Sequence, residues 1–476
     1  MFVYVSAFVQ NIRSLSMFSE KHTMTMAVGT GIVGAGMLFL WSRRWTQSKE
    51  CKTPTGITID DLRDPEIRAK HIEFNEMLLR KFPSDDAIKV DGDLGGIPVY
   101  IVHRHERVSE VINNHETFTS NPWLGSRSIV ALNTMEKPEH DRIVRLLKKS
   151  YSPLGISSWE SVIWDLVNHH GEILKLDGDV YKFSKRFHMH LSLLTSGLYD
   201  DVAPAGAELD QFIEWNDSAV LLAAPLGGVG MRPSYSFPNI RDMFVGIMHS
   251  IPQVIRLSRK IGVIEAWKLL SPFESIFPSA PYTQCWNFTE KLAQIPAYFT
   301  RVYDLMSTAR KDTPAGNLYS NIGLSISASE ALATTVQLMV NMTTANAIMS
   351  LIFRMRENAG VTVEQILLED APLQRNPRRA KRDALIGSVR IPKGSIILLM
   401  IGVANITCPA GGAYSTFGFG LHHCLGRHLV LLELSIVKEW ILKHIGGKKL
   451  HVVSADRLVD RDVGNWGFSK LQISPF

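Results

Sequence analysis

Apolar and polar positions repeat with a helical period along most of the chain. Between residues 165 and 303 the apolar positions recur at helical spacing, and prolines and glycines interrupt the pattern. Strand patterns are fewer. Residues 97–102 form one, and residues 384–401 contain apolar runs on both sides of the turn Pro392-Lys393-Gly394. The pattern predicts a mainly α protein with a minor β component.

Three further helices are predicted at specific positions. One covers residues 105–113, and a second begins at Pro138, where a proline loses no intrahelical hydrogen bond. The longest covers residues 327–356 and begins with the capping-box spacing of Ser327 and Glu330. At 1.5 Å per residue it would be a rod of roughly 45 Å.

The long helix has no charge between residues 331 and 353, so a membrane span is the competing interpretation. Lipid would leave its polar side chains without partners, which favours a central helix buried in protein. Those side chains are Thr334, Thr335, Gln337, Asn341, Thr343, Thr344 and Asn346.

An uncharged stretch near the N-terminus, MTMAVGTGIVGAGMLFLW over residues 24–41, is long enough to cross a bilayer. Arg43 and Arg44 follow it directly, which predicts that the rest of the chain faces the cytosol. A signal peptide or a mitochondrial presequence is the alternative interpretation. We expect an N-terminal segment (1–23), a transmembrane anchor (24–41), a linker (42–56) and one catalytic domain (57–476).

Composition narrows the function classes. The 476 residues carry a net charge of +5, and their basic side chains are scattered rather than clustered, so we expect no nucleic-acid partner. The four cysteines include no C-x-x-C pair, which argues against a disulfide framework and a zinc ribbon. The cysteines are Cys51, Cys285, Cys408 and Cys424.

One cysteine lies in a glycine-rich loop before a long apolar helical pattern, in the stretch FGFGLHHCLGRH over residues 417–428. Gly418, Gly420 and Gly426 remove side chains, so the loop can lie flat against a planar cofactor. A helix predicted to start near Leu425 would place its positive N-terminal end beside the Cys424 sulfur. A thiolate is a strong ligand for iron.

The pattern Phe417-x-x-Gly420-x-His422-x-Cys424-x-Gly426 resembles the haem-binding signature of the cytochrome P-450 family. The resemblance extends over nearly the whole chain after the linker. It implies the P-450-like fold, haem b as cofactor, and Cys424 as the iron ligand, with Phe417, Gly418, Gly420 and Gly426 forming the loop around it.

The same resemblance implies which residues bind the haem propionates. His140, on the helix that begins at Pro138, matches a propionate contact of the family, although Val144 stands where the family usually has an arginine. Arg378 matches the propionate-binding arginine of a late strand, and a guanidinium suits that role through its paired donors. His422 is the third candidate. A solvated basic run is the alternative interpretation of residues 378–382.

Two features depart from the family pattern. On the long helix Thr343 matches the family's alcohol, but Met342 replaces its acid and cannot relay protons. Oxygen activation would then depend on Asn341, Thr343 or water. The buried Glu-x-x-Arg pair is also missing, because Gln365 and Leu368 occupy its positions. Such a chain is either a divergent member of the family or the product of an imperfect gene model.

The resemblance implies a haem-thiolate monooxygenase that oxidises a small lipophilic substrate, for example in secondary metabolism. The chain has no flavin or nicotinamide fingerprint, so electrons would come from an NADPH-dependent reductase or another donor. A haem-thiolate isomerase or dehydratase, or a non-catalytic haem protein, is the alternative. The predicted location is the endoplasmic reticulum membrane with a cytosolic domain, with the mitochondrion as alternative.

Overall fold

The computed structural model describes residues 56–63, 70–93, 96–120, 132–200, 204–223, 240–270, 288–339, 341–409, 415–445, 449–457 and 467–475. These belong to one compact unit, Glu50–Phe476. The predicted anchor at residues 24–41 lies outside the described residues. Helices predominate and strands form a minor part, so the predicted fold class is confirmed.

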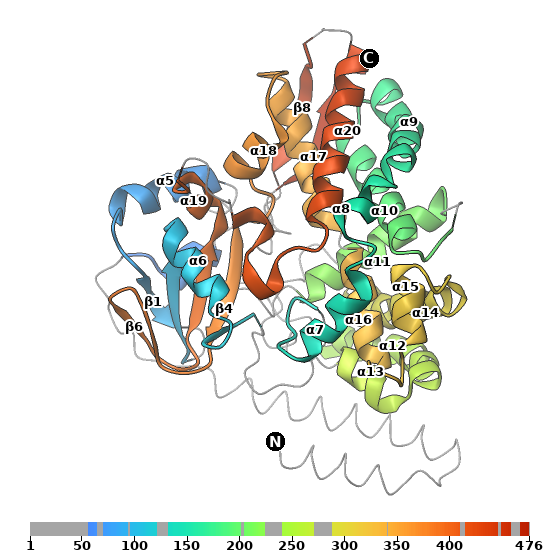
Figure 1. Cartoon of the computed structure of the whole chain (residues 1–476), viewed down its shortest axis with the longest axis horizontal. Coiled ribbons are helices and arrows are strands. Elements are labelled where there is room, and N and C mark those ends of the chain that lie inside the picture. The colour runs from blue at the N-terminus through green and yellow to red at the C-terminus, as the bar shows by residue number, and fades with distance from the viewer. Residues whose placement is uncertain are drawn as a thin grey trace, which may run out of the picture. The chain divides into compact units, whose positions relative to one another are not determined.

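A five-stranded sheet combines segments from both ends of the chain (Figure 1). Its order is β1-β2-β7-β4-β3. Strands β2 and β7 run parallel, with Val99 opposite Ile396, whereas β4 is antiparallel to β7, with Arg378 opposite Ile397. The strands are β1 (Ile88–Asp93), β2 (Pro98–Val102), β3 (Phe118–Thr119), β4 (Arg375–Ala380) and β7 (Ile396–Met400).

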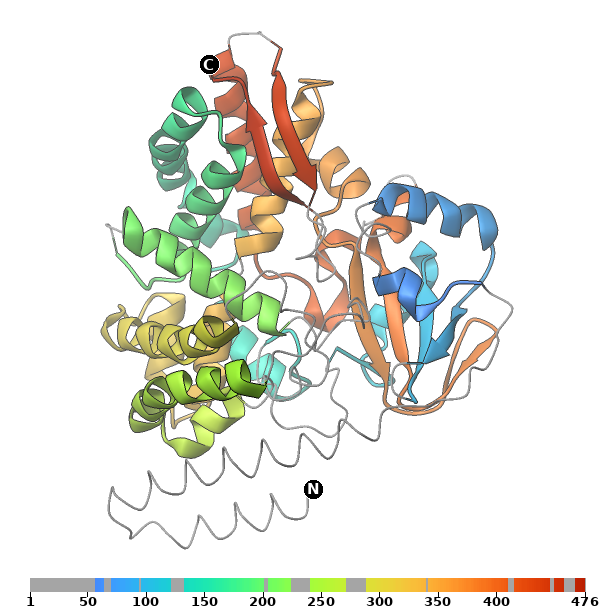
Figure 2. The same ribbon diagram turned by 180° about the vertical axis from the view of Figure 1, so that it is seen from behind.

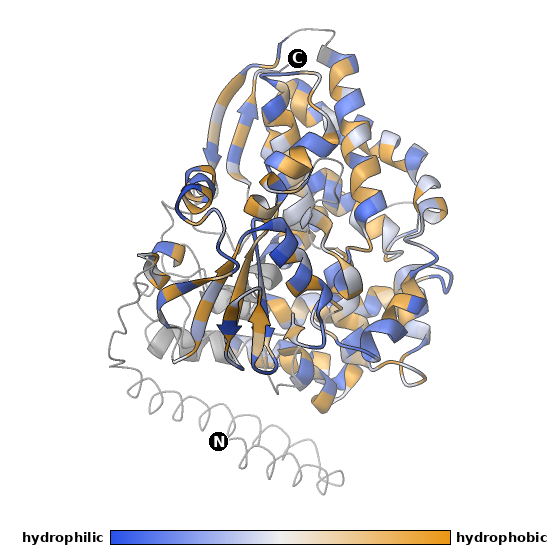
Figure 3. Cartoon of the chain, turned by 60° about the vertical axis from the view of Figure 1, so that its left-hand side comes forward, coloured by the Kyte–Doolittle hydropathy of each residue, from blue (hydrophilic) through white to orange (hydrophobic). Residues whose placement is uncertain are grey.

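Both faces of this sheet are covered, because side chains of a strand alternate between its two faces. Val99 and Ile101 belong to one apolar cluster, whereas Tyr100 and Val102 belong to another. Figure 3 shows the hydrophobic residues along these strands. The helices that contribute to the two clusters include α3 (Ile59–Arg63), α5 (His71–Lys81), α6 (His105–Asn113) and α19 (Ile401–Ile406).

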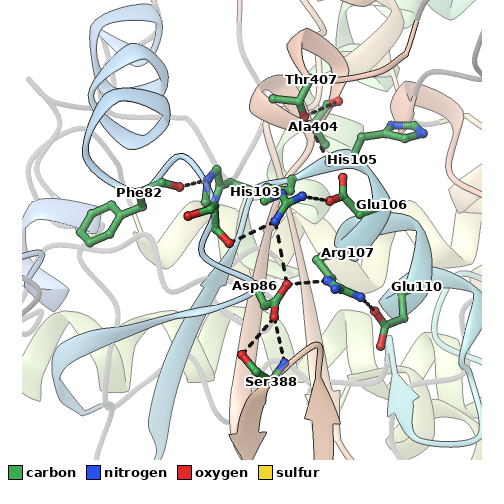
Figure 4. A network of polar contacts seen from close by, with 12 residues as sticks. Phe82, Asp86, His103, His105, Glu106, Arg107, Glu110, Ser388, Ala404 and Thr407 are labelled. Atoms are coloured by element: carbon green, nitrogen blue, oxygen red, sulfur yellow. Dashed lines mark hydrogen bonds and ion pairs between the residues drawn. The ribbon is translucent and has the colours of Figure 1, made fainter.

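A polar network fastens the chain before β1 to the hairpin of β5 (Ala384–Ile386) and β6 (Val389–Ile391) (Figure 4). The Asp86 carboxylate accepts hydrogen bonds from the Ser388 backbone N–H at 2.8 Å and from Arg107 Nε at 2.7 Å. These bonds hold the pKa of Asp86 below its usual value, with the Ser388 N–H as the largest cause. Gly387 has φ +55° and leaves room for this carboxylate.

The remaining helices pack around one large apolar core and are seen from behind in Figure 2. The described strands β8 (Val452–Arg457) and β9 (Phe468–Ile473) form a hairpin near the C-terminus. The helices are α7 (Glu139–Leu147), α8 (Pro153–Ser157), α9 (Glu160–Leu176), α10 (Val180–Thr195), α11 (Ala207–Ala223), α12 (Ile240–Ile261), α13 (Val263–Leu270), α14 (Phe288–Thr308), α15 (Pro314–Ser320), α16 (Ala328–Leu338), α17 (Asn341–Met355), α18 (Val363–Glu369) and α20 (Arg427–Ile445).

The predicted long helix is described as two segments, α16 and α17, with Met339 in a turn and Val340 outside the described residues. Its capping box at Ser327 and Glu330 is present, but α16 ends at Leu338 and α17 begins at Asn341. The Met339 N–H bonds to the Val336 carbonyl, three residues back, at 3.2 Å, which closes α16 with a tighter turn. Among the described residues, only the segment 328–355 is long and apolar enough to cross a membrane, and 67% of its most apolar stretch is buried in the protein. Burial favours the core-helix interpretation.

Three histidines of α9 and α10 lie together, and their burial predicts that the folded protein is less stable in acid. His170 Nε2 lies 3.0 Å from His190 Nδ1, and the His169 ring centroid lies 4.8 Å from that of His170. Burial is the main cause that lowers the pKa of His170 to about 3 and of His190 to about 4.

Because these pKa values lie below the unfolded value near 6.5, the unfolded chain binds more protons below that pH. We expect the free energy of unfolding to fall as the pH drops from 6.5 towards 4, by about 2 kcal/mol at pH 5 from His170 alone. Urea unfolding at several pH values measures this loss. The variant H170F should show a flatter profile, and an unchanged slope would contradict the assignment.

Candidate functional site

The loop that carries Cys424 is built from two short helical turns, Ser415–Phe417 and Gly420–His422, followed by α20. The Cys424 N–H donates to the Phe417 carbonyl at 2.8 Å, which closes the loop on itself. Gly418 (φ +68°) and Gly420 (φ +59°) adopt left-handed backbone conformations that favour glycine. The helix begins at Arg427, two residues later than the start near Leu425 that the sequence predicts.

The Cys424 side chain is exposed on one side, while the surrounding protein withdraws the thiol from water. This burial raises the pKa of Cys424, and a hydrogen bond from the Gly426 N–H opposes the rise without reversing it. The N-terminal end of the helix was expected to favour ionisation of the Cys424 thiol, but burial disfavours ionisation more strongly. Without a metal the thiol is protonated at neutral pH, and metal binding would release that proton.

The three polar residues proposed from sequence as propionate ligands come from separate elements and lie close together. His140 of α7 and His422 of the cysteine loop stack edge to face, with ring centroids 5.1 Å apart. Arg378 of β4 is near enough for its charge to lower the pKa of His422, after burial as the larger cause, to about 3. Burial likewise lowers the pKa of His140. Both imidazoles are therefore neutral donors at neutral pH.

Two members of this cluster, Arg378 and His422, have no acidic partner in the described part of the chain, whereas His140 Nδ1 lies 3.4 Å from Asp141 Oδ1. Arg378 is buried, and its guanidinium donates to Asn376 Oδ1 at 2.7 Å and to the Pro377 carbonyl at 2.9 Å, with no carboxylate paired to it in the described part of the chain. Burial lowers the pKa of Arg378 to about 10. His422 Nδ1 is buried without a hydrogen-bond partner. Because a buried charge needs a counter-charge, an anionic group fits here.

The residues present thus fit a haem. Cys424 offers a soft ligand for iron, the glycines leave the loop without bulky side chains, and Arg378, His140 and His422 offer donors for the acidic edge of the macrocycle. No group of three or more His, Cys, Asp or Glu side chains that could hold a metal ion occurs in the described ranges.

Asn341 and Thr343, the residues proposed to take part in oxygen activation, lie in the first turn of α17. Asn341 begins this helix, and its side chain and that of Met342 lie outside the described residues. Thr343 is half-buried and Thr344 is buried. Helix α17 packs against α20, which follows the cysteine loop.

The positions of the missing Glu-x-x-Arg pair have local roles. Gln365 closes a capping box with Thr362 at the start of α18, and Leu368 is half-buried. A different buried pair joins α10 to α20, where His188 Nδ1 lies 2.9 Å from Glu433 Oε1.

Sequence reasoning missed two residues of this site. Ser120 Oγ lies 3.1 Å from His422 Nε2 and thereby orients that ring. Tyr151 is buried near enough to Cys424 for the thiol's charge to raise the pKa of its phenol, after burial as the larger cause. Neither belongs to a motif, so only packing reveals them. The candidate pocket residues Trp123, Ile129 and Val130 lie outside the described residues.

Comparisons with known proteins agree with the geometry. The chain is 27% identical over 276 residues to a putative cytochrome P450 133B2 of Xylella fastidiosa, covering 50% of this chain and 64% of that relative. It is 23% identical over 442 residues to cytochrome P450 CYP107DY1 of Priestia megaterium, covering 84% of this chain and 94% of that relative. No protein-family model matches.

Solved structures share the fold. CYP109E1 of Bacillus megaterium, in complex with testosterone, superposes with a TM-score of 0.61 at 17% identity and covers 86% of this chain and 99% of its own. The cytochrome P450 PksS of Bacillus subtilis gives 0.60 at 16% identity, with 86% and 98% covered. The fold is therefore that of the haem-thiolate proteins. Together with the sequence relatives, these structures support a divergent member of the cytochrome P450 family.

Proposed function

We propose that this chain is a haem b monooxygenase in which Cys424 holds the iron. The observation that supports it most strongly is the buried Arg378, which lies near His422 and has no acidic partner in the described residues. The haem supplies the activation of dioxygen. Cys424 would bind the haem iron. Arg378, His140 and His422 would orient the haem, and Thr343 would hold a proton donor near it.

The carbon monoxide difference spectrum tests this function. The reduced holoprotein should show the red-shifted Soret band of a thiolate adduct. A band at the position of histidine-ligated haem, or no haem uptake, would contradict the proposal.

Replacing Arg378 tests the propionate assignment. In the variant R378M we expect haem to dissociate about 10- to 100-fold faster, because a buried charge-assisted pair is worth roughly 1.5–3 kcal/mol. Transfer of haem to apomyoglobin measures the rate. The matched control R379M changes the neighbouring half-buried arginine, whose Nε donates to the Gly394 carbonyl at 2.9 Å. Equal rates for R378M and wild type would remove Arg378 from the site.

We propose that the substrate is a small lipophilic molecule and that a separate reductase supplies the electrons. The reaction could belong to secondary metabolism. Family relatives support this class, since a similar structure was solved with testosterone bound. Apolar pockets bury such ligands readily. A screen for spectral shifts with terpenoids, polyketides and fatty acids narrows the class, and hits confined to hydrophilic compounds would contradict it.

The second candidate is a haem-thiolate isomerase or dehydratase, favoured by Met342 in place of the family's acid. A non-catalytic haem protein is a variant of the same idea. Turnover with a reductase and dioxygen, without added peroxide, counts against it. A large gain of such turnover in M342D would show that the native chain is impaired in monooxygenation.

We propose that residues 24–41 anchor the chain in the endoplasmic reticulum membrane with the domain in the cytosol. The uncharged stretch and the arginines after it support this. A chain truncated near Thr53 should leave membranes under mild salt and keep its haem spectrum. If it stays bound after an alkaline wash, residues 328–355 become the candidate span. Protection of the domain from added protease would place it in a lumen instead.

A further inference from the structure

Helix α19 presents one buried amide to the chain that leads into the cysteine loop. Asn405 lies in the last turn of this helix and has an exposed fraction of 1%. Its Oδ1 atom accepts a hydrogen bond from the Ser415 N–H at 2.7 Å. Its Nδ2 atom donates to the Leu367 carbonyl at 3.2 Å and to Thr416 Oγ1 at 2.8 Å. The amide therefore uses both its acceptor and its donors, as a buried amide requires.

The Thr416 hydroxyl completes this network. It donates its one proton to the Leu367 carbonyl at 2.6 Å, and its oxygen accepts from the Asn405 amide. Leu367 belongs to α18, whereas Ser415 and Thr416 belong to the first of the two short helical turns of the cysteine loop. Asn405 is 38 residues from Leu367 and 10 residues from Ser415. One side chain thus joins three separate segments of the chain.

The hydrogen bonds continue from this turn to the backbone of Cys424. The turn Ser415–Phe417 is followed directly by Gly418, whose N–H donates to the Ser415 carbonyl at 2.9 Å. The Phe417 carbonyl in turn accepts from the Cys424 N–H at 2.8 Å. Because only one rotatable bond lies between the cysteine backbone and its sulfur, the backbone largely determines where the sulfur lies. A side chain that holds this turn therefore also positions the sulfur.

Helix α18 is also the helix on which the buried Glu-x-x-Arg pair is missing. Gln365 and Leu368 occupy its positions, and neither side chain is charged, so an ion pair between these positions cannot brace the helix. The network of Asn405 joins the same helix to the cysteine loop through neutral groups. A neutral network avoids the cost of removing two charges from water.

We propose that Asn405 is the positioning residue of the cysteine loop, whose amide replaces the missing ion pair and holds the loop against α18. The inference rests on the proposed function, in which Cys424 binds the haem iron. The network consists of an amide, a hydroxyl and backbone groups, and none of these titrates near neutral pH. Its hold on the loop is therefore insensitive to salt, unlike that of an exposed ion pair.

The lifetime of the thiolate adduct tests this role. The reduced holoprotein with carbon monoxide is kept in urea below its unfolding transition, and the conversion of the thiolate-type band to a non-thiolate band is followed. In N405A we expect this conversion to be about 10-fold or more faster, because the buried Ser415 N–H loses its partner. Tryptophan fluorescence, which reports global unfolding, should stay native. Conversion that occurs only together with global unfolding would overturn the inference.

Variants of the two neighbouring residues serve as controls. T416V loses the hydroxyl and should convert faster than wild type but more slowly than N405A, whereas T416S keeps the hydroxyl and should match wild type. S415A removes a buried hydroxyl that has no hydrogen-bond partner and keeps the backbone N–H, so it should also match wild type. If S415A converts as fast as N405A, any small cavity loosens the loop and the inference fails. If N405A does not fold, N405D, which keeps the acceptor and loses the donors, decides with T416V.

Hydrogen exchange gives a readout that does not depend on the iron ligand. In the protein as purified, the peptide that covers residues 415–424 should exchange about 10-fold faster in N405A than in wild type, while the β8–β9 hairpin should not change. Equal exchange of this peptide in both proteins would overturn the inference. A wild type without the thiolate band contradicts the proposed function instead, and the exchange rates then still decide whether Asn405 holds the loop.

Discussion

The variant C424A is expected to lose the thiolate-type carbon monoxide band completely. Cys424 is the only cysteine in the glycine loop, and none of the side chains around it is a second soft ligand. The raised pKa of the thiol means that the iron, not the loop, drives its ionisation. We therefore expect the loss to be all or none, as measured by the difference spectrum of the reduced protein.

Cys408 provides a matched control for this experiment. Its thiol is half-buried, 3.8 Å from His105 Nε2, and burial raises its pKa too. The variant C408A should keep the full band and its position. A band that survives in C424A, or disappears in C408A, would place the iron ligand elsewhere.

Replacing His188 alone is expected to destabilise the protein by about 3–5 kcal/mol, because Glu433 would be left as a buried, unpaired carboxylate. Glu433 has an exposed fraction of 0%, and His188 Nδ1 lies 2.9 and 3.1 Å from its two carboxylate oxygens. The double variant H188L/E433L removes both groups and should recover most of this loss. Urea unfolding of the holoprotein measures the three free energies.

Ser192 is the control for the same network. Its hydroxyl lies 3.3 Å from His188 Nε2, on the opposite side of the ring from Glu433. S192A should cost only about 0.5–1.5 kcal/mol, as expected for the loss of one typical hydrogen bond. A double variant as unstable as H188L would show that packing, and not the unpaired charge, causes the loss.

Much of this fold could be predicted from local patterns. The helix at 105–113 has the predicted bounds, and the strand predicted at 97–102 is found at Pro98–Val102. The strands predicted within 384–401 are also present, as β5, β6 and β7. These elements have clear periodicity and unambiguous turn residues, so neighbours in the sequence determine them.

The break in helical hydrogen bonding at Met339 was not predictable, because no proline or glycine marks it. Residues 338–342 read Leu-Met-Val-Asn-Met, which suits a helix interior. Tertiary packing determines such a break, and a single sequence carries no signal of it. The same limit explains Tyr151 and Ser120, whose place in the site follows only from how distant segments pack.

The candidate site residues also fall into two groups, those found through a sequence motif and those matched only by their position on a helix. Cys424, His422, His140 and Arg378 were found through a motif, and the structure brings the last three together. Their roles stay proposals until haem binding is measured. Asn341 and Thr343 were matched by position on a helix, and the structure places both in the first turn of α17.

The pairing of β2 with β7 has a consequence for synthesis on the ribosome. Asp86 and Ser388, which lie in the same polar network beside this sheet, are separated by 302 residues. At 5–20 residues per second the first strands emerge about 15–60 s before their partner. During that time the apolar edge of β2 has no partner strand, which is the condition under which nascent chains aggregate or recruit chaperones. Slow translation or low temperature should therefore change the yield of this protein more than that of one whose sheet is built from consecutive strands.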